Sequence, residues 1–219
     1  MPTDTRRRNL TRAPSRNPSP PDGLVKLPRS FYLRPTLAVA RDLIGCTLIR
    51  RSRRGCLAGR IVEVEAYLGS RDPASHSYRG RTARNDVMFW EGGHLYVYFT
   101  YGMHYCCNVV TGREGLGHAV LIRALEPAVG IDEMRRNRRT AGTVRDLCSG
   151  PARICQAMHI TRRENGTDLC GATIWIASDR NACRRPRVRR SPRIGIRHGR
   201  EHRWRFTLAG SPFLSRDAP

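Results

Sequence analysis

The sequence has almost no lysine and no long apolar run. Of its 40 lysine and arginine residues only Lys26 is a lysine, so Schiff-base chemistry has one side-chain amine available. The other candidate amine is that of Pro2, after loss of Met1. No segment approaches the ~20 consecutive apolar residues of a membrane-spanning helix, and residues 1–24 lack the apolar stretch of a signal peptide. We therefore expect a soluble, intracellular protein without membrane association.

The eight cysteines form no C-x-x-C pair, which is the spacing that structural zinc sites most often show. In a reducing compartment we expect buried free thiols that pack as small apolar side chains. The sequence therefore predicts no metal site and no cofactor.

Acidic residues are scarce beside basic ones. The chain has 40 basic and 18 acidic residues, a formal net charge of +22 over 219 residues, which favours a polyanionic partner such as nucleic acid. Residues 1–24 combine arginine, serine and proline with little to bury, and predict a disordered basic arm before a single domain over 25–219. A second basic run, over 184–205, is interleaved with apolar residues and predicts two basic-faced strands. A solvated surface is the alternative for both runs.

Between these runs, short strands and turns outnumber helices. Turns rather than long helical crossovers connect the strands, so we predict a mixed α/β (α+β) fold with a mainly antiparallel sheet and helices packed on it. Helices are expected over 37–44, ended by Gly45, and over 151–159, with Ser149 near the start and Pro151 in the first turn. The expected strands cover 47–50, 60–67 and 118–124, with a hairpin over 95–110.

The strand over 60–67 carries two carboxylates. Its alternation places Ile61, Glu63, Glu65 and Tyr67 on one face. Glu63 is expected to be a salt-bridge partner in this arginine-rich chain. Glu65 is the stronger functional candidate, because Tyr67 lies beside it and the polar segment 69–76 that follows can close over a pocket.

The hairpin over 95–110 requires a turn residue that tolerates positive φ. A loop over 100–102, with Gly102 in the left-handed position, places Tyr98 opposite His104 and puts Tyr98, His104 and Asn108 on one face. A two-residue loop would move Asn108 to the other face. Either loop leaves Tyr101 at the tip, as a wedge for base steps or as a ring folded back on the hairpin.

Together these features match the needs of an enzyme that extracts a base from duplex DNA. Such an enzyme fills the gap in the duplex and holds the flipped base between aromatic rings, beside its catalytic group. A carboxylate next to the sugar can stabilise an oxocarbenium-like state and deprotonate the attacking water. Glu65 is the candidate for both tasks.

Three segments, IVEVEAYLG over 61–69, LYVYFTYGMHYCCN over 95–108 and VLIRALEP over 120–127, resemble the alkyladenine (3-methyladenine) DNA glycosylases. The segments DPASH, RNDVMF, CSGPARICQ and GSPF keep the family's order, so the resemblance runs from about residue 27 to residue 213. It implies a curved sheet with a protruding β-hairpin. The short basic segment over 197–203 departs from the longer, partly acidic segment that the family has there.

The resemblance also implies roles for individual residues. Glu65 matches the general base that activates water, and Arg123 the arginine that helps to hold that water. Tyr101 matches the side chain that replaces the flipped base from the minor groove, and Asn108 the asparagine that clashes with the guanine 2-amino group. The pocket that stacks the purine corresponds to Tyr67, His76 and Tyr98. From spacing alone, His76 and Arg123 are an ordinary loop histidine and an ion-pair arginine.

These matches imply a monomeric, monofunctional DNA glycosylase of base excision repair that acts on double-stranded DNA with a damaged purine. It would work at the bacterial nucleoid, or in the nucleus of a eukaryote. A noncatalytic nucleic-acid-binding protein explains the charge but gives Glu65 no use. An RNA-acting enzyme of similar fold is the other alternative.

Overall fold

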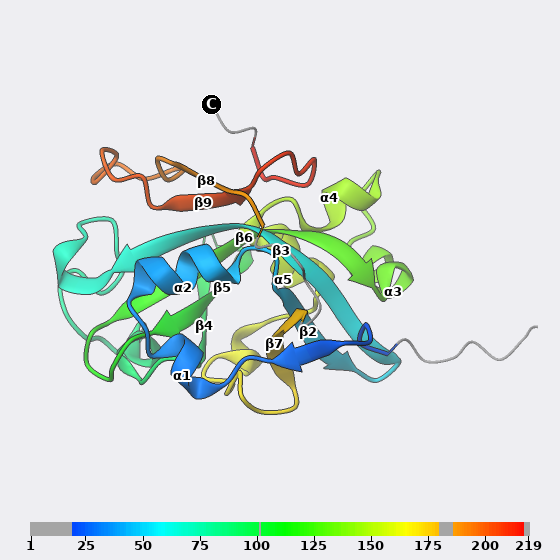
Figure 1. The fold of residues 1–219 in the computed structure, drawn as a ribbon, viewed down its shortest axis with the longest axis horizontal. Helices are drawn as coiled ribbons and strands as arrows, with labels where there is room; N and C mark the ends of the chain where they lie inside the picture. The colour runs from blue at the N-terminus through cyan, green and yellow to red at the C-terminus, as the bar shows by residue number, and fades with distance from the viewer. Residues whose placement is uncertain (1–18, 101, 180–185, 217–219) are drawn as a thin grey trace, which may run out of the picture.

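The structure, a computed structural model, describes residues 19–100, 102–179 and 186–216. Most of the predicted basic arm and all of Tyr101 lie outside these residues. Within them, nine strands form one sheet in which all paired strands run antiparallel, with helices packed on it (Figure 1). The predicted mixed α/β class with a mainly antiparallel sheet is confirmed.

The sheet runs in the order β1-β7-β2-β3-β6-β5-β4, and β9 pairs with both β3 and β8. β3 therefore has β6 along one edge, and β2 followed by β9 along the other. The strands are β1 (Leu24–Lys26), β2 (Thr47–Ser52), β3 (Gly55–Leu68), β4 (Leu95–Thr100), β5 (His104–Thr111), β6 (His118–Val129), β7 (Ile174–Asp179), β8 (Val188–Ser191) and β9 (Arg205–Leu208).

The two predicted helices are present. The first ends before Gly45, whose φ of +90° favours glycine. The second begins at Pro151, but its N-cap is Gly150, and Ser149 instead accepts a hydrogen bond from the Arg153 guanidinium. The α-helices are α1 (Arg29–Tyr32), α2 (Thr36–Leu43), α3 (Ile131–Asn137), α4 (Val144–Cys148) and α5 (Pro151–Ala157); the 3-10 helices are η1 (Gly69–Arg71), η2 (Asp86–Phe89) and η3 (Arg162–Glu164).

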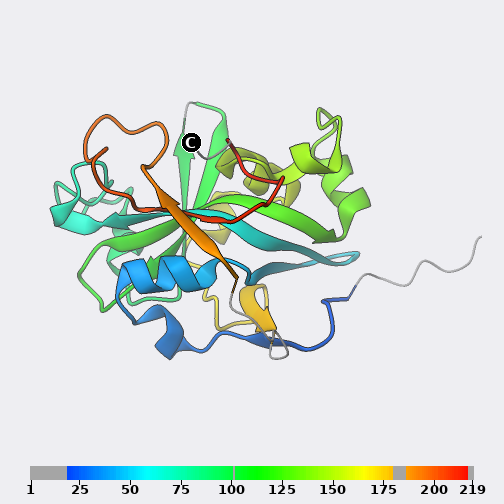
Figure 2. The ribbon, with the colours of Figure 1, turned by 45° about the horizontal axis from the view of Figure 1, so that its top comes forward.

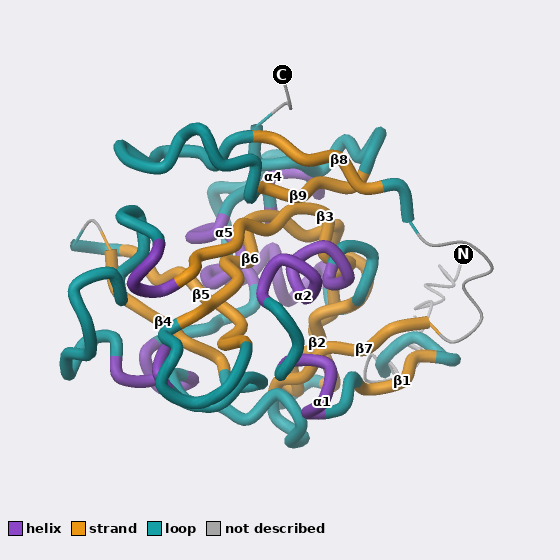
Figure 3. Tube along the Cα trace, turned by 60° about the vertical axis from the view of Figure 1, so that its left-hand side comes forward, coloured by secondary structure: helices purple, strands orange, loops and turns teal. Residues whose placement is uncertain are grey.

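The two faces of the central strands differ in chemistry. Val64 of β3 and Ile122 of β6 are fully buried in an apolar core that they share with α2, α4 and α5. Figure 3 shows α2 lying across the sheet at this core. Since successive side chains alternate between faces, Glu65 and Arg123 lie on the opposite face, away from the apolar core. The polar groups of the site are thus separated from the main core by the sheet itself.

An irregularity in the pairing of β3 with β6 corrects one part of the predicted strand. The register shifts on both sides of Glu63 and interrupts the strict alternation of faces there, although Ile61 and Val64 pair with Leu125 and Ile122, which are also three positions apart. Ile61 therefore packs in the same core as Val64, and not on the face of Glu63 and Glu65 as strict alternation predicted. Val62 packs instead with Ala124 on the other side.

The predicted hairpin is present, but the pairing of its two strands is shifted by two residues from the predicted register. Thr100 pairs with His104 and Tyr98 with Cys106, so the paired strands end at Thr100 and begin again at His104, and the predicted pairing of Tyr98 with His104 is wrong. An even shift leaves every side chain on its predicted face, and Tyr98 still shares a face with Asn108. Gly102 has the expected positive φ of +68°. Figure 2 shows this green hairpin projecting beyond the sheet.

The second basic run is only partly a pair of basic-faced strands. β8 and β9 do pair, but residues 192–204 connect them without forming a strand. Arg193 and Arg205 are 5% and 1% exposed and point inward, where they meet buried carboxylates. Of the apolar residues between them, Ile194 and Ile196 line the cavity described below, and Trp204 packs against the Arg193 guanidinium. These contacts explain why apolar residues alternate with arginines in this run.

Candidate active site

A cavity of about 400 Å³ lies where β3, β4, β5 and β6 meet the loop over 72–76 and the connection over 192–204. It contains five of the seven predicted site residues, which come from four different strands and one loop. The five residues are Tyr67, His76, Tyr98, Asn108 and Arg123. Tyr101 lies outside the described residues, and Glu65 lies directly behind the cavity wall.

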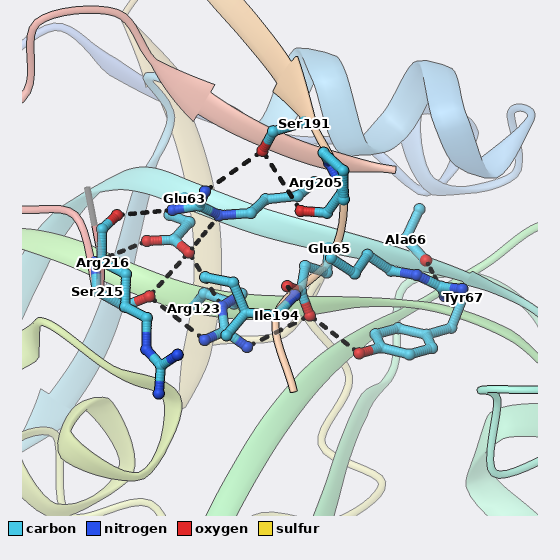
Figure 4. Close-up of polar contacts among 12 residues, drawn as sticks. Glu63, Glu65, Ala66, Tyr67, Arg123, Ser191, Ile194, Arg205, Ser215 and Arg216 are labelled. Atoms are coloured by element: carbon cyan, nitrogen blue, oxygen red, sulfur yellow. Dashed lines mark hydrogen bonds and ion pairs between the residues drawn. The ribbon is translucent and has the colours of Figure 1, made fainter. Parts of the chain in front are cut away.

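Glu65 is fully buried and makes three contacts, each to a residue that lines the cavity (Figure 4). Its Oε2 accepts a hydrogen bond from the Tyr67 hydroxyl at 2.9 Å and one from Arg123 Nη1 at 3.3 Å. Its Oε1 accepts the Ile194 backbone N–H at 2.7 Å. The carboxylate is ion-paired, yet it lies at a cavity with room for a nucleobase.

The environment of Glu65 makes it a stronger base than an exposed glutamate. Burial raises the pKa of its carboxyl above the ordinary value, because the ionised form loses its water. Arg123, the Ile194 N–H and the Tyr67 hydroxyl oppose this increase, since each stabilises the ionised form. A carboxylate that is held ionised but is more basic than usual is suited to accepting a proton from water.

Glu63 has the salt-bridge role that the sequence predicted for it. It is fully buried, and its Oε1 accepts bonds from Arg123 Nε at 3.0 Å and Arg205 Nε at 2.8 Å. Ser215 donates to the same carboxylate from its backbone N–H, at 2.7 Å, and from its hydroxyl, at 2.8 Å. Glu63 does not line the cavity; it fixes Arg123, which does.

Aromatic rings form one side of the cavity. Tyr96 and Tyr98 stack with ring centroids 5.5 Å apart, and His76 meets Tyr98 edge-on at 4.5 Å. The Asn108 side chain donates to the Tyr96 carbonyl at 3.2 Å, which fixes its orientation beside these rings. Such aromatic rings favour contact with a flat, unsaturated ligand.

His76 is held neutral at its place in this wall. Burial, together with the nearby Arg84, lowers the pKa of its imidazole. Its Nδ1 lies 3.3 Å from the Tyr96 hydroxyl, and its carbonyl accepts a bond from Asn85 at 2.8 Å. A neutral imidazole is a weak proton source, so this environment does not favour His76 as a general acid.

A second buried ion pair holds the loop over 72–76 against the cavity. The Arg193 guanidinium donates to both oxygens of Asp72, at 2.6 and 2.8 Å, and both side chains are fully buried. Asp72 in turn accepts the backbone N–H groups of Leu68 and Ala74. The guanidinium also lies 4.6 Å from the Tyr67 ring centre, so it supports that ring as well as the loop.

Sequence reasoning missed Arg193, Arg205 and the Ile194 N–H as parts of this site. The sequence did contain one indication of them. A carboxylate that is buried needs a cationic partner, so the few acidic residues of this chain that become buried, such as Glu63 and Asp72, must pair with arginines. The apolar residues around Arg193 and Arg205 indicated that these two arginines are partly enclosed. Which carboxylate each would meet depends on contacts more than 100 residues apart in the chain.

In the described part of the chain, no group of three or more histidine, cysteine, aspartate or glutamate side chains could hold a metal ion. The seven cysteines among these residues are free thiols. No helix among the same residues is long and apolar enough to cross a membrane.

A buried carboxylate beside an aromatic cavity of this size, in a strongly basic chain, is typical of enzymes that act on an unpaired nucleobase. The family profile for methylpurine-DNA glycosylase matches residues 30–212, which include every predicted site residue. The chain belongs to this family.

Curated relatives cover almost the whole chain. A protein of Burkholderia orbicola, provisionally named a 3-methyladenine DNA glycosylase, is 47% identical over 206 residues, 94% of this chain and 98% of the relative. Proteins of Methanoculleus marisnigri and Carboxydothermus hydrogenoformans with the same name are 49% and 47% identical, over 88% and 87% of this chain and 100% and 98% of their own lengths. The resemblance found from the motifs is thus confirmed.

Proposed function

We propose that this protein is a monofunctional DNA glycosylase of base excision repair. It extrudes an alkylated or otherwise modified purine from duplex DNA and hydrolyses the bond between that purine and its sugar. The observation that carries the proposal is the placement of Glu65 against a base-sized aromatic cavity, with each of its three partners in the cavity wall. Family membership and the names of the relatives agree with it.

In the proposed reaction Glu65 takes a proton from water as the water oxygen forms a bond to the sugar C1′. The C1′–N9 bond breaks and its electron pair leaves with the purine, so the products are a free purine and an abasic sugar. The negative charge of Glu65 also stabilises the oxocarbenium-like transition state. Arg123 holds the carboxylate and, from the cavity wall, contributes to holding the water.

The cavity wall is proposed to select the base. A purine alkylated at N3 or N7 carries positive charge, which favours its stacking on Tyr67 and Tyr98 and makes it a good leaving group. His76 completes the stack, and Asn108 blocks the guanine 2-amino group. Tyr101, outside the described residues, is proposed to fill the gap left in the duplex. All of these residues come from one chain, as in the expected monomer.

Backbone cleavage is not part of this proposal. A glycosylase that also cuts the strand needs an amine that can form a Schiff base. The Lys26 amine is at the opposite end of the sheet order from the cavity strands, on β1, and it donates to the Cys170 and Gly171 carbonyls. Among the described residues that line the cavity, none carries a side-chain amine.

The test is release of free purine from methylated duplex DNA by the purified protein, followed by alkaline cleavage at the abasic site. We expect free alkylpurine and strand breaks only after alkali. Release from methylated RNA alone would support the RNA-acting alternative. Tight DNA binding without release from either substrate would support the noncatalytic one.

The pH profile tests Glu65 as the base. Glu65 must be ionised to act, so base release should fall as the pH falls through its raised pKa. Substituting Tyr67 with phenylalanine keeps the ring but removes a hydrogen bond that stabilises the ionised form. We therefore expect the acidic limb of the single-turnover profile to move to higher pH in Y67F.

The matched control is Y98F. It also removes a tyrosine hydroxyl from the aromatic side of the cavity, but this hydroxyl makes no hydrogen bond to Glu65. Its acidic limb should coincide with that of the wild type. An unchanged limb in Y67F would contradict the assignment of the limb to Glu65.

A further inference from the structure

The buried network around Glu63 also fixes a segment that the proposed mechanism does not use. After β9 the chain returns to the sheet, and Ser215 is held there by two hydrogen bonds to Glu63. The next carbonyl, that of Arg216, accepts a bond from Arg205 Nη2 at 2.8 Å (Figure 4). Arg205 is 1% exposed and is itself paired with Glu63. The backbone at 215–216 is therefore anchored through two fully buried side chains.

This anchor places the Arg216 side chain at the cavity. Arg216 is one of the residues that line it, together with Arg123 on β6. Arg123 is 9% exposed and paired with two carboxylates, whereas Arg216 is exposed. Among the described residues no acidic side chain pairs with Arg216, and Figure 4 draws a contact to its backbone oxygen but none to its guanidinium. Of the two arginines that line the cavity in the described part of the chain, Arg123 is thus paired with carboxylates of the protein, whereas Arg216 has no acidic partner there.

An extruded nucleotide needs such a cation. The base occupies the aromatic part of the cavity and the sugar lies at Glu65, so the two phosphates that flank the sugar must lie at the open side. A guanidinium binds phosphate through parallel, charge-assisted hydrogen bonds. Arg216 reaches the cavity from the side of Glu63 and Arg123, next to the place that the proposed reaction gives to the sugar.

We propose that Arg216 binds a backbone phosphate of the extruded nucleotide, and that the Glu63–Arg205–Ser215 anchor exists to hold it there. This inference rests on the proposed function. It gives the buried Glu63 and Arg205 a role beyond stability. Their hydrogen bonds hold the backbone at 215–216, and this backbone positions the Arg216 side chain at the cavity. Contacts to the undamaged parts of the duplex would come from other arginines.

The experiment compares R216Q with R189Q. Arg189 is an exposed arginine of β8 that does not line the cavity, so both variants lose one surface charge. Binding is measured in the E65Q background, which should retain the base, with duplexes that are identical except for one alkylated purine. Each titration is repeated over a range of salt concentrations, and R216K tests rescue by a point charge.

We expect R216Q to weaken binding of the lesion duplex about tenfold and binding of the undamaged duplex less than twofold. The salt slope for the lesion duplex should fall by about 0.9, the value for one phosphate contact. R189Q should weaken binding of both duplexes equally, and R216K, which restores the charge but not the paired hydrogen bonds, should recover part of the lost affinity. Equal losses on both duplexes in R216Q, or no loss, would overturn the proposal.

A separate measurement distinguishes this failure from that of the proposed function. The protein with Glu65 intact is assayed for purine release from the same lesion duplex. Release by the wild type together with wild-type lesion binding by R216Q rejects only the role of Arg216. Absence of release by the wild type rejects the proposed function itself.

Discussion

Base release from alkylated duplex DNA is expected to fall by a factor of about 10² to 10⁴ in E65Q, the range that general-base catalysis contributes. Glutamine has nearly the shape of glutamate but cannot take the proton from water. It also loses the negative charge that stabilises the transition state. Single-turnover release of free purine, measured at a pH well above the raised pKa of Glu65, checks this expectation.

Two controls distinguish a loss of catalysis in E65Q from a loss of folding or of DNA binding. E65Q should keep the far-ultraviolet circular dichroism of the wild type, since Arg123 remains paired with Glu63, and should bind lesion duplex with similar affinity. E126Q alters another carboxylate, on β6, that does not line the cavity, and it should retain wild-type release. Unchanged purine release in E65Q would reject Glu65 as the base.

The largest loss of stability is expected in E63Q, at about 3–5 kcal/mol of unfolding free energy. The substitution removes the charge that faces two buried guanidinium groups, those of Arg123 and Arg205. Arg205 would then have only hydroxyl and carbonyl acceptors. Urea titration followed by circular dichroism measures the change.

The matched control for E63Q is E91Q, which removes one partner of an exposed ion pair with Arg29. Exposed pairs contribute about 0–1 kcal/mol, so this variant should unfold close to the wild type. A loss in E63Q no larger than that in E91Q would show that Glu63 is not the electrostatic centre of the network.

Local patterns predicted most of the fold because its elements are short and end at clear signals. Gly45 and Pro151 mark a helix end and a helix start through their own backbone preferences, and Gly102 marks the hairpin turn. The errors have local causes too. The irregular pairing around Glu63 breaks strict alternation, and the choice of loop residues shifted the hairpin register by two.

The candidate site was less accessible to pattern reasoning. Alternation placed Glu65 with Tyr67, and Tyr98 with Asn108, on shared faces, as the structure does. His76 and Arg123 came only from the family resemblance, because a loop histidine and a strand arginine carry no periodic signal. Arg193 could not be placed, since its position depends on a connection that packs back over β3 from a distant part of the chain.

The link between Glu63 and Ser215 joins residues 152 positions apart. On a ribosome, β3 emerges long before the segment that supplies Ser215 and the buried Arg205. Until that segment arrives, Glu63 and Arg123 lack part of the contacts that fix them in the folded protein, and the candidate active site of the nascent chain is incomplete. Newly made protein should therefore gain its hydrolytic competence as one of the last events of folding.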